Sequence, residues 1–294
     1  MYILPFFIKV RHYSIHGKQK FLTLKVNYNI EEKEMNSMDN WKDSDLNVDS
    51  LWVIGERDKT GKHANVYHGN FVPQIPNQLI RRYTKENDLV MELFSGSGTT
   101  LFECERLKRN YIGFDINKKI ISYVREKMRD CDAIKYSLCE CDVVDNATFE
   151  QITIDTFKEM SYESADFLIA HPPYLDIVKF TDDDRDLSKI SDLAIFIGKF
   201  VKAMKNGLCF LAKNKYFAVV AGDVYKSSEV VPLAFHMMNA IKQNFNVKLK
   251  GIIVKNIEGN KGKLRTQDIW KYRALKSDYF LFKHEYIFVF KKLD

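Results

Sequence analysis

The residues of this chain that could do chemistry fall at two places, and the first is the corner IAHPPYLD (169–176). An apolar run typical of a buried strand, ADFLIA (165–170), leads directly into the sequence HPPY (171–174). Proline lacks a backbone N–H and fixes its backbone angles, so the carbonyl oxygens of such a corner stay available to accept hydrogen bonds. The pattern predicts a rigid acceptor site at the carboxyl end of a strand, where open α/β sheets bind ligands. The structural alternative is a double proline that only ends the strand.

The second place is the glycine turn ELFSGSGTT (92–100). Gly96 and Gly98 allow a sharp turn and a close approach of the backbone to a ligand, and a helix that begins behind them would direct its first N–H groups at an anionic group. Asp115 ends the next apolar run, about 20 residues further on, where an acid can bond ribose hydroxyls. Asp142 ends the run after that, placed to meet an adenine amino group. Plain helix caps are the alternative for both aspartates.

Two features of this turn favour S-adenosylmethionine over a dinucleotide. Glu92 precedes the turn, and its negative charge suits a cationic sulfonium better than a pyrophosphate. The third glycine of the dinucleotide fingerprint is missing after Gly98-Thr99-Thr100. Nicotinamide or flavin binding is the alternative, and a dehydrogenase is the weakest reading because no acid for hydride transfer is evident.

These two places need a regular framework, and from residue 70 onward the apolar pattern provides one. Strands are expected at 88–94, 111–116, 134–142, 165–170, within 207–223, and at 248–256 and 284–292, with helices at 74–84, 100–108, 118–130, 149–160, 190–205 and 230–245. This alternation predicts an α/β fold: a doubly wound, mostly parallel, seven-stranded sheet with helices on both faces. The last two strands are too close for a helical crossover, so we expect one of them to be antiparallel.

ELFSGSGTT, FDI and HPPY, in this order, resemble the motifs of the amino-methyltransferases of DNA, which methylate adenine N6 or cytosine N4. The resemblance covers roughly residues 65–292 and implies S-adenosylmethionine as cofactor. It also implies a site-specific transfer to a flipped base, with adenine slightly favoured. YHGNFVPQIPNQLIRRYT (67–84) is similar to the segment that helps to hold the methionine part of the cofactor. The implied cofactor-binding residues are Phe71, Pro73, Glu92, Phe94, Gly96, Gly98, Thr99, Thr100, Asp115 and Asp142, and the implied catalytic residues are His171, Pro172, Pro173 and Tyr174.

The corner suits this chemistry because an exocyclic amino nitrogen is a poor nucleophile while its lone pair is delocalised into the ring. The carbonyl of Pro172 and the side chain at 171 could accept its two hydrogens, and Tyr174 could stack on the base. The family has Asp, Asn or Ser at this position, whereas this chain has His171. A neutral histidine can accept a hydrogen bond and a protonated one cannot, so we expect activity to fall as His171 protonates. The alternative is a methyltransferase-like subunit without activity.

The rest of the chain indicates the domain organisation and the candidate contacts with nucleic acid. Residues 1–65 are expected to be a lead-in, with a hairpin or an upstream start in 1–34, and 66–294 a catalytic domain with a basic insertion at about 257–281. The net charge of +6 permits a nucleic-acid partner. Candidate contacts are Lys179, Arg185, Lys261, Lys263, Arg265, Trp270, Lys271 and Arg273, for which a solvated charged surface is the alternative.

Composition also restricts the remaining classes. Five cysteines without a CxxC pair predict no metal site and a reducing, cytoplasmic location. MYILPFFIKV (1–10) is too short to span a bilayer. We expect double-stranded DNA as partner, with a restriction or specificity protein compatible with the short insertion. Amino groups of RNA or protein are the alternative substrates.

Overall fold

The computed structural model describes residues 42, 44–63, 69–257, 267–276 and 278–294 of the chain. It divides into two compact units, Met1–Asp45 and Leu46–Asp294, and all that follows concerns the second. The expected hairpin in 1–34 and the candidate DNA contacts Lys261, Lys263 and Arg265 lie outside the described residues.

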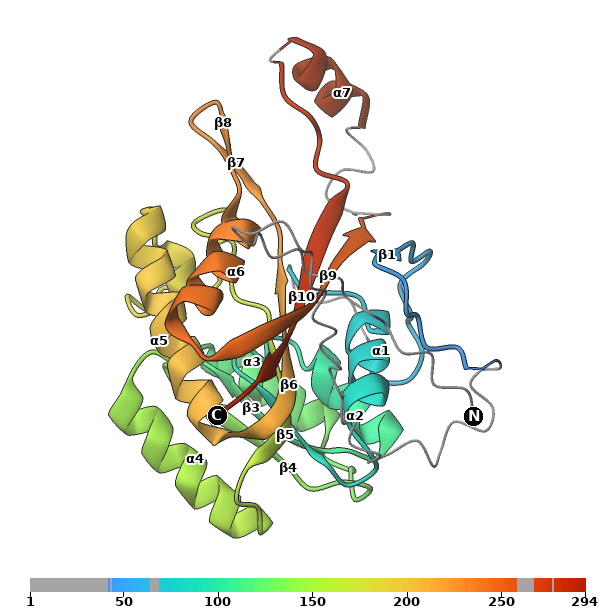
Figure 1. Ribbon diagram of the computed structural model, residues 1–294, viewed down its shortest axis with the longest axis vertical. Helices are drawn as coiled ribbons and strands as arrows, with labels where there is room; N and C mark the ends of the chain where they lie inside the picture. The colour runs from blue at the N-terminus through green and yellow to red at the C-terminus, as the bar shows by residue number, and fades with distance from the viewer. Residues whose placement is uncertain (1–41, 43, 64–68, 258–266, 277) are drawn as a thin grey trace, which may run out of the picture. The chain divides into compact units, whose positions relative to one another are not determined.

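A single large sheet organises the second unit (Figure 1). Its strand order is β1-β9-β10-β6-β5-β2-β3-β4. The strands are β1 (Leu51–Trp52), β2 (Leu89–Glu92), β3 (Asn110–Asp115), β4 (Tyr136–Glu140), β5 (Ala165–Ala170), β6 (Leu211–Ala221), β9 (Val247–Asn256) and β10 (His284–Lys292). From β4 to β6 all neighbours are parallel, and β10 runs antiparallel to both β6 and β9. The α/β class and the single antiparallel strand of the final pair are as expected.

The strand count differs from the expectation, because the described sheet has eight strands and not seven. The additional strand, β1, pairs in parallel with β9 through Leu51 and Trp52 alone. Two residues are too few to give a periodic signal, so sequence patterns could not reveal it. Trp52 is nonetheless buried, which explains why this short edge pairs at all.

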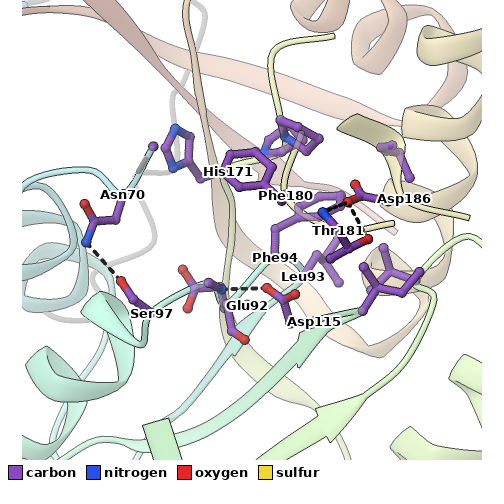
Figure 2. Close-up of a pocket in the computed structure, with 18 of the residues that line it drawn as sticks. Asn70, Glu92, Leu93, Phe94, Ser97, Asp115, His171, Phe180, Thr181 and Asp186 are labelled. Carbon is purple, nitrogen blue, oxygen red and sulfur yellow. Dashed lines mark hydrogen bonds between the residues drawn. The ribbon is translucent and has the colours of Figure 1, made fainter. Parts of the chain in front are cut away.

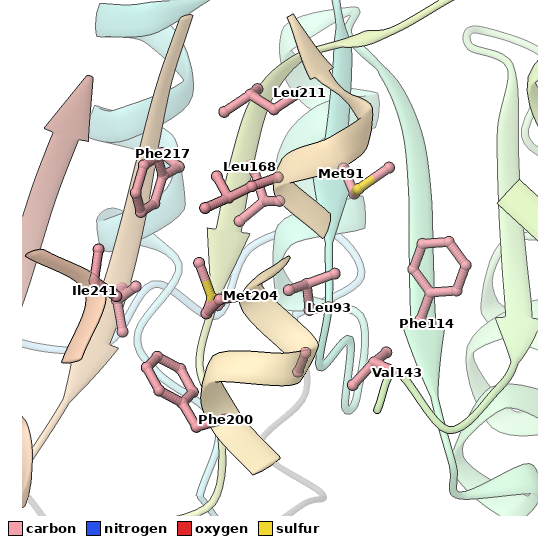
Figure 3. Packing of buried hydrophobic residues seen from close by; sticks show 14 of the residues in the cluster. Met91, Leu93, Phe114, Val143, Leu168, Phe200, Met204, Leu211, Phe217 and Ile241 are labelled. Atoms are coloured by element: carbon pink, nitrogen blue, oxygen red, sulfur yellow. The ribbon is translucent and has the colours of Figure 1, made fainter. Parts of the chain in front are cut away.

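Helices cover both faces of the sheet and enclose two apolar cores. Strand side chains alternate between the faces: Leu168 contributes to one core and Phe167 and Ile169 to the other. The first core lies under α4 (Asn146–Met160), α5 (Leu193–Phe210) and α6 (Leu233–Asn244), and Figure 3 shows part of it. The second lies under α1 (Gln74–Tyr83), α2 (Thr99–Leu107) and α3 (Lys118–Lys127).

Helix α5 runs further than its sequence pattern indicates, through Gly207 to Phe210. A Cβ atom at Gly207 would lie 2.8 Å from a Leu168 methyl and 2.9 Å from Leu93. The glycine, which usually weakens a helix, here lets the helix approach the sheet closely.

Two smaller elements extend beyond the carboxyl edge of the sheet (Figure 1): the hairpin β7 (Val224–Lys226) and β8 (Glu229–Val231), and the helix α7 (Gln267–Lys276) of the basic insertion. Lys271 and Arg273 are exposed on α7, and Trp270 belongs to the same helix. No helix among the described residues is long and apolar enough to cross a membrane.

Candidate active site

One cavity opens at the carboxyl edge of the sheet, where the chain leaves β4, β3, β2 and β5 (Figure 2). In the sheet, β3 and β4 lie on one side of β2, and β5 and β6 lie on the other. The carboxyl end of β2 is therefore the switch point at which doubly wound sheets bind ligands. Asp142, Asp115, the glycine turn and the His-Pro-Pro-Tyr corner therefore follow one another along the edge. Three strand spacings amount to about 14 Å, room for an extended molecule made of a nucleoside and an amino acid.

The glycine turn is tied to the end of β3. The carboxylate of Asp115 accepts hydrogen bonds from the backbone N–H groups of Gly96 at 2.7 Å and Asn117 at 2.8 Å. Burial raises the pKa of Asp115 to about 6, although these backbone hydrogen bonds act in the opposite direction. Helix α2 begins at Thr99 directly behind the turn, so its first N–H groups lie beside the cavity.

Gly98 serves packing within the protein. Its φ of 81° is in the left-handed region, and an added Cβ would lie 2.7 Å from a Val124 methyl on α3. Gly96 also has a positive φ, 47°, but lines the cavity. The two glycines of the turn thus have different roles: Gly98 allows close packing against α3, and Gly96 lines the cavity.

Glu92 is almost completely buried beneath the turn and lines the cavity. Its two carboxylate oxygens accept the hydroxyl groups of Thr100 and Tyr111, each at 2.6 Å. Burial raises the pKa of Glu92 to about 8, while these two hydrogen bonds lower it and the neighbouring Asp115 raises it. At neutral pH this carboxyl group is therefore mainly in its neutral form, and it becomes charged as the pH rises through about 8.

The glycine turn has polar groups that a ligand could satisfy. The hydroxyl of Ser95 is buried and has no hydrogen-bond partner within the described residues, although Ser95 lines the cavity. Asn70 donates to the Ser97 hydroxyl at 2.9 Å and so links the segment before α1 to the turn (Figure 2). An orphaned hydroxyl, two acidic strand ends and a helix N-terminus fit a nucleoside joined to an amino acid.

At the corner, His171 and Tyr174 form a pair. His171 Nε2 lies 3.0 Å from the Tyr174 hydroxyl oxygen, and the imidazole packs against Phe71 with 4.9 Å between ring centroids. The carbonyl of Phe71 in turn accepts from Arg57 at 2.8 Å. Burial lowers the pKa of His171 to about 4, with a small opposing effect from Glu285. His171 is therefore neutral at physiological pH.

The segment after the corner closes one side of the cavity. Asp186, which is buried, accepts from the backbone N–H and hydroxyl of Thr181 (Figure 2). It also accepts from the backbone N–H of Ser188. Asp176 accepts from Lys226 of β7 at 2.8 Å and ties the segment to the hairpin. The segment is thus a structured wall held by carboxylates.

Most of the predicted site residues meet in this cavity. It is lined by Phe71, Glu92, Phe94, Gly96, Thr99, Asp115, Asp142, His171, Pro172, Pro173, Tyr174 and Arg185. Pro73, Gly98 and Thr100 do not line it: Pro73 precedes α1, and Thr100 bonds Glu92. One oxygen of Asp142 accepts the Val144 N–H at 2.9 Å in the turn after β4. The N-cap of α4 is Asp145, so Asp142 is not the helix cap that its alternative described.

The candidate nucleic-acid contacts are more scattered. Arg185 lines the cavity but forms a two-point ion pair with Asp183, at 3.0 and 2.6 Å. Lys179 is exposed beside the cavity without lining it, and Lys271 and Arg273 lie on α7.

Sequence reasoning missed the cavity residues Asn70, Ser95, Phe180, Thr181 and Asp186. Residues of these types are common in ordinary loops. Only Asp186, which lies in an acidic run, differed from such a loop in the sequence. Among the described residues no group of three or more His, Cys, Asp or Glu could hold a metal ion.

Fold and cavity together define a class: a doubly wound α/β protein whose ligand site lies at the switch point, beside a Pro-Pro-Tyr corner. Residues 69–256 match the family model described as D12 class N6 adenine-specific DNA methyltransferase, and residues 7–126 match a model described as DNA methylase. The first match covers more than half of the chain and includes both motifs. The chain belongs to this family of DNA amino-methyltransferases, whose cofactor is S-adenosylmethionine.

Individual relatives are similar over shorter stretches. Type II methyltransferase M.MjaII of Methanocaldococcus jannaschii is 32% identical over 93 residues, which are 30% of this chain and 17% of that protein. Type II methyltransferase M2.LlaDCHI of Lactococcus lactis is 29% identical over 124 residues, 40% of this chain and 44% of that protein. The chain thus spans less than half of the length of either relative. The crystal structure of TrmN from Thermus thermophilus aligns with a TM-score of 0.47 at 14% identity, over 77% of this chain and 50% of that one.

Proposed function

We propose that this chain transfers a methyl group from S-adenosylmethionine to the exocyclic amino group of a flipped base in double-stranded DNA, with adenine N6 favoured over cytosine N4. The observation behind the proposal is that the His-Pro-Pro-Tyr corner and the glycine turn line one cavity at adjacent strands. The description of the family model that spans both motifs, N6 adenine-specific, supports adenine. The type II names of the relatives support a modification role beside a restriction or specificity partner.

The cofactor supplies a methyl group that is activated as an electrophile on a sulfonium sulfur. The predicted cofactor-binding residues that line the cavity would hold this cofactor. Asp115 would bond ribose hydroxyls, Asp142 the adenine amino group, and the N-terminus of α2 the carboxylate of the methionine part. Glu92, in its charged form, would stabilise the positive sulfur.

The corner acts on the other reactant. The Pro172 carbonyl and the neutral His171 imidazole accept hydrogen bonds from the two amino hydrogens, which localises the nitrogen lone pair for attack on the methyl carbon. The carbon–sulfur bond would break as the nitrogen–carbon bond forms, and the methylated nitrogen would give up one proton, with His171 as the nearby acceptor. Tyr174 stacks on the base and fixes its plane. Positioning and hydrogen bonding of this kind supply most of the catalysis, because no covalent enzyme intermediate forms.

The test is methyl transfer to unmodified duplex DNA, with isotopically labelled S-adenosylmethionine and identification of the labelled nucleoside by mass. We expect N6-methyladenine in the wild-type digest and none with His171→Phe. Labelled N4-methylcytosine would overturn the choice of base. Cofactor binding without any label in DNA would favour RNA or protein amino groups, and the absence of both binding and label would favour a non-catalytic subunit.

A further inference from the structure

Two large apolar side chains are exposed where the cavity opens. Ile177 is 55% and Val178 is 39% exposed, and both line the cavity beside the His-Pro-Pro-Tyr corner. An isolated exposed apolar side chain is ordinary in a soluble protein. Of the exposed large apolar side chains in the described part of the chain, however, only these two line the cavity. They follow Tyr174 by three and four residues and lie where a substrate would enter.

The backbone before Ile177 makes a sharp turn. Leu175 has a φ of 53°, in the left-handed region that residues with a side chain seldom adopt. Its own side chain belongs to the first core and is only 1% exposed. The N–H of Ile177 donates to the carbonyl of Tyr174 at 3.4 Å and closes the turn. The fold thus maintains an unfavourable backbone conformation at a buried residue, and the side chain two positions later is exposed beside the cavity.

Polar contacts hold this turn on both sides. The Asp176 carboxylate accepts from Lys226 of β7 at 2.8 and 3.1 Å. Further along the chain, the N–H of Phe180 donates to the hydroxyl of Ser188 at 3.1 Å. Residues 177–179 lie between these two contacts, and all three are exposed. A side chain supported in this way keeps its position when another molecule presses against it.

Extrusion of a base leaves a gap in the stack of the duplex, and closure of that gap returns the base. An enzyme that flips a base must therefore offset the free energy of unpairing and unstacking it. Proteins that distort DNA do so with apolar side chains, Ile among them, that enter between neighbouring bases. Such a side chain must be apolar, project beside the base pocket and resist displacement. Ile177 meets these three requirements, and the exposed Lys179 offers a charge for a phosphate.

We propose that Ile177 enters the stack of duplex DNA as the target base leaves it, and so keeps the base in the cavity. This proposal rests on the proposed function and deepens it, because it assigns a residue that acts on the duplex and not on the cofactor or the amino group. Ile177 is chosen over Val178 because it is the more exposed and has the longer side chain. The ion pair of Asp176 and Lys226 supports the turn that carries it.

The test compares two synthetic duplexes that differ in how easily the target base is extruded. Both carry the base that the wild type methylates, and in the second the opposite nucleotide is changed so that this base is mismatched. On the paired duplex, Ile177→Ala should lower kcat/KM by about 10- to 100-fold, the range that corresponds to burial of one aliphatic side chain. On the mismatched duplex, where extrusion needs less free energy, the loss relative to wild type should be no more than about threefold.

Control variants and a spectroscopic measurement separate this role from damage to the protein. Ile195→Ala removes a similarly exposed side chain, 58% exposed on α5 and outside the cavity lining, and should match wild type on both duplexes. Ile177→Leu keeps the apolar volume and should retain most of the rate. With the fluorescent adenine analogue 2-aminopurine at the target position and S-adenosylhomocysteine bound, wild type should increase the fluorescence by unstacking the analogue, and Ile177→Ala should increase it less. The affinity of Ile177→Ala for S-adenosylhomocysteine should equal that of wild type.

The outcomes separate the two proposals. Three results would overturn the role of Ile177 while leaving the methylation of DNA established: equal losses on the paired and mismatched duplexes, a rate for Ile177→Ala like that of Ile195→Ala, or a weaker affinity of Ile177→Ala for S-adenosylhomocysteine. Absence of methylation of any duplex by the wild type would overturn the proposed function, and the role of Ile177 with it.

Discussion

The Asp115 carboxylate accepts the backbone N–H of Gly96 at 2.7 Å, and this hydrogen bond joins the end of β3 to the turn that follows β2. One side chain thereby shapes the glycine turn and lines the cavity. The two motifs that the sequence presents separately, the turn and the acid after the next strand, are one physical unit.

Asp115→Asn should therefore weaken cofactor binding. Hydrogen bonds to a charged group contribute about 1.5–3 kcal/mol, which corresponds to a loss of roughly 10- to 150-fold in affinity. Titration calorimetry with S-adenosylhomocysteine measures it. Asp166→Asn is the control, because Asp166 also accepts a strand N–H, that of Leu89 at 3.0 Å, but does not line the cavity. Equal losses in the two variants would show that the effect is general destabilisation.

The ionisation of Glu92 should make cofactor binding depend on pH. Its pKa of about 8 means that the carboxyl group becomes charged above neutrality. Affinity for S-adenosylmethionine relative to S-adenosylhomocysteine, which lacks the charge on sulfur, should rise by about three- to tenfold across that range. Glu92→Gln should abolish this rise in relative affinity. If the ratio of the two affinities did not depend on pH in the wild type, the role of the Glu92 charge would be refuted.

The same group has a consequence for folding. Because its pKa is raised in the folded state, its neutral form contributes stability that is complete below the ordinary pKa of 4.5 and is lost as pH rises to about 8. The protein without cofactor should therefore lose stability toward pH 8. Urea denaturation at several pH values is the measurement, and Glu92→Gln should show a flatter profile.

His171 should affect the low end of the pH profile. Sequence alone predicts a fall in rate near the ordinary histidine pKa of 6.5, but burial lowers the pKa of His171 to about 4. The contribution of His171 to the rate should then stay constant down to about pH 5 and fall only below it, whereas stability should already decline between 6.5 and 4. Initial rates of wild type and His171→Asn test this, and a midpoint near 6.5 that is absent from His171→Asn would contradict it.

Gly222, at the end of β6, leaves space for the Tyr174 ring. An added Cβ would lie 2.9 Å from Tyr174 Cε2, so Gly222→Ala must displace the ring on which the base is proposed to stack. We expect at least a tenfold loss in kcat/KM for DNA, which is about the contribution of one stacked base, with S-adenosylhomocysteine affinity unchanged. Gly251→Ala is the matched strand variant, since its nearest neighbour is Val289 Cβ at 4.0 Å.

The basic insertion should contribute to DNA affinity through phosphate contacts. Lys271 is exposed on α7, and Lys271→Ala should weaken binding equally for all sequences and reduce the salt dependence by about one charge. Lys202→Ala, on the exposed side of α5, serves as control. Fluorescence anisotropy at several salt concentrations measures both, and equal salt slopes for wild type and Lys271→Ala would exclude the contact.

The framework was predictable because buried parallel strands leave a strong apolar pattern. Leu168 and Phe167 belong to opposite cores, yet both are apolar, so the run ADFLIA stands out in the sequence. The helix α7 is less visible, because it is a short element in a basic segment and its apolar residues Ile269, Tyr272 and Leu275 are exposed.

The polar environment of the corner could not be predicted in the same way. The ion pair of Glu285 and Lys255 is separated from His171 by long stretches of chain, and the strand that carries each of them gives no indication of its partner. Glycine is common at strand ends, so the sequence does not indicate that Gly222 makes room for the Tyr174 ring. Contacts of this kind depend on the strand order of the finished sheet, which local patterns do not contain.

That strand order has a consequence for biosynthesis. β10 follows all the other described strands in sequence, yet it lies between β6 and β9 and pairs with both. Until residues 284–292 leave the ribosome, each of these two strands keeps an edge that could pair with another chain, and the pairing of β10 with β6 spans a long sequence separation, which slows folding. Because β10 also carries Glu285, the sheet and the environment of His171 are completed in the same late step.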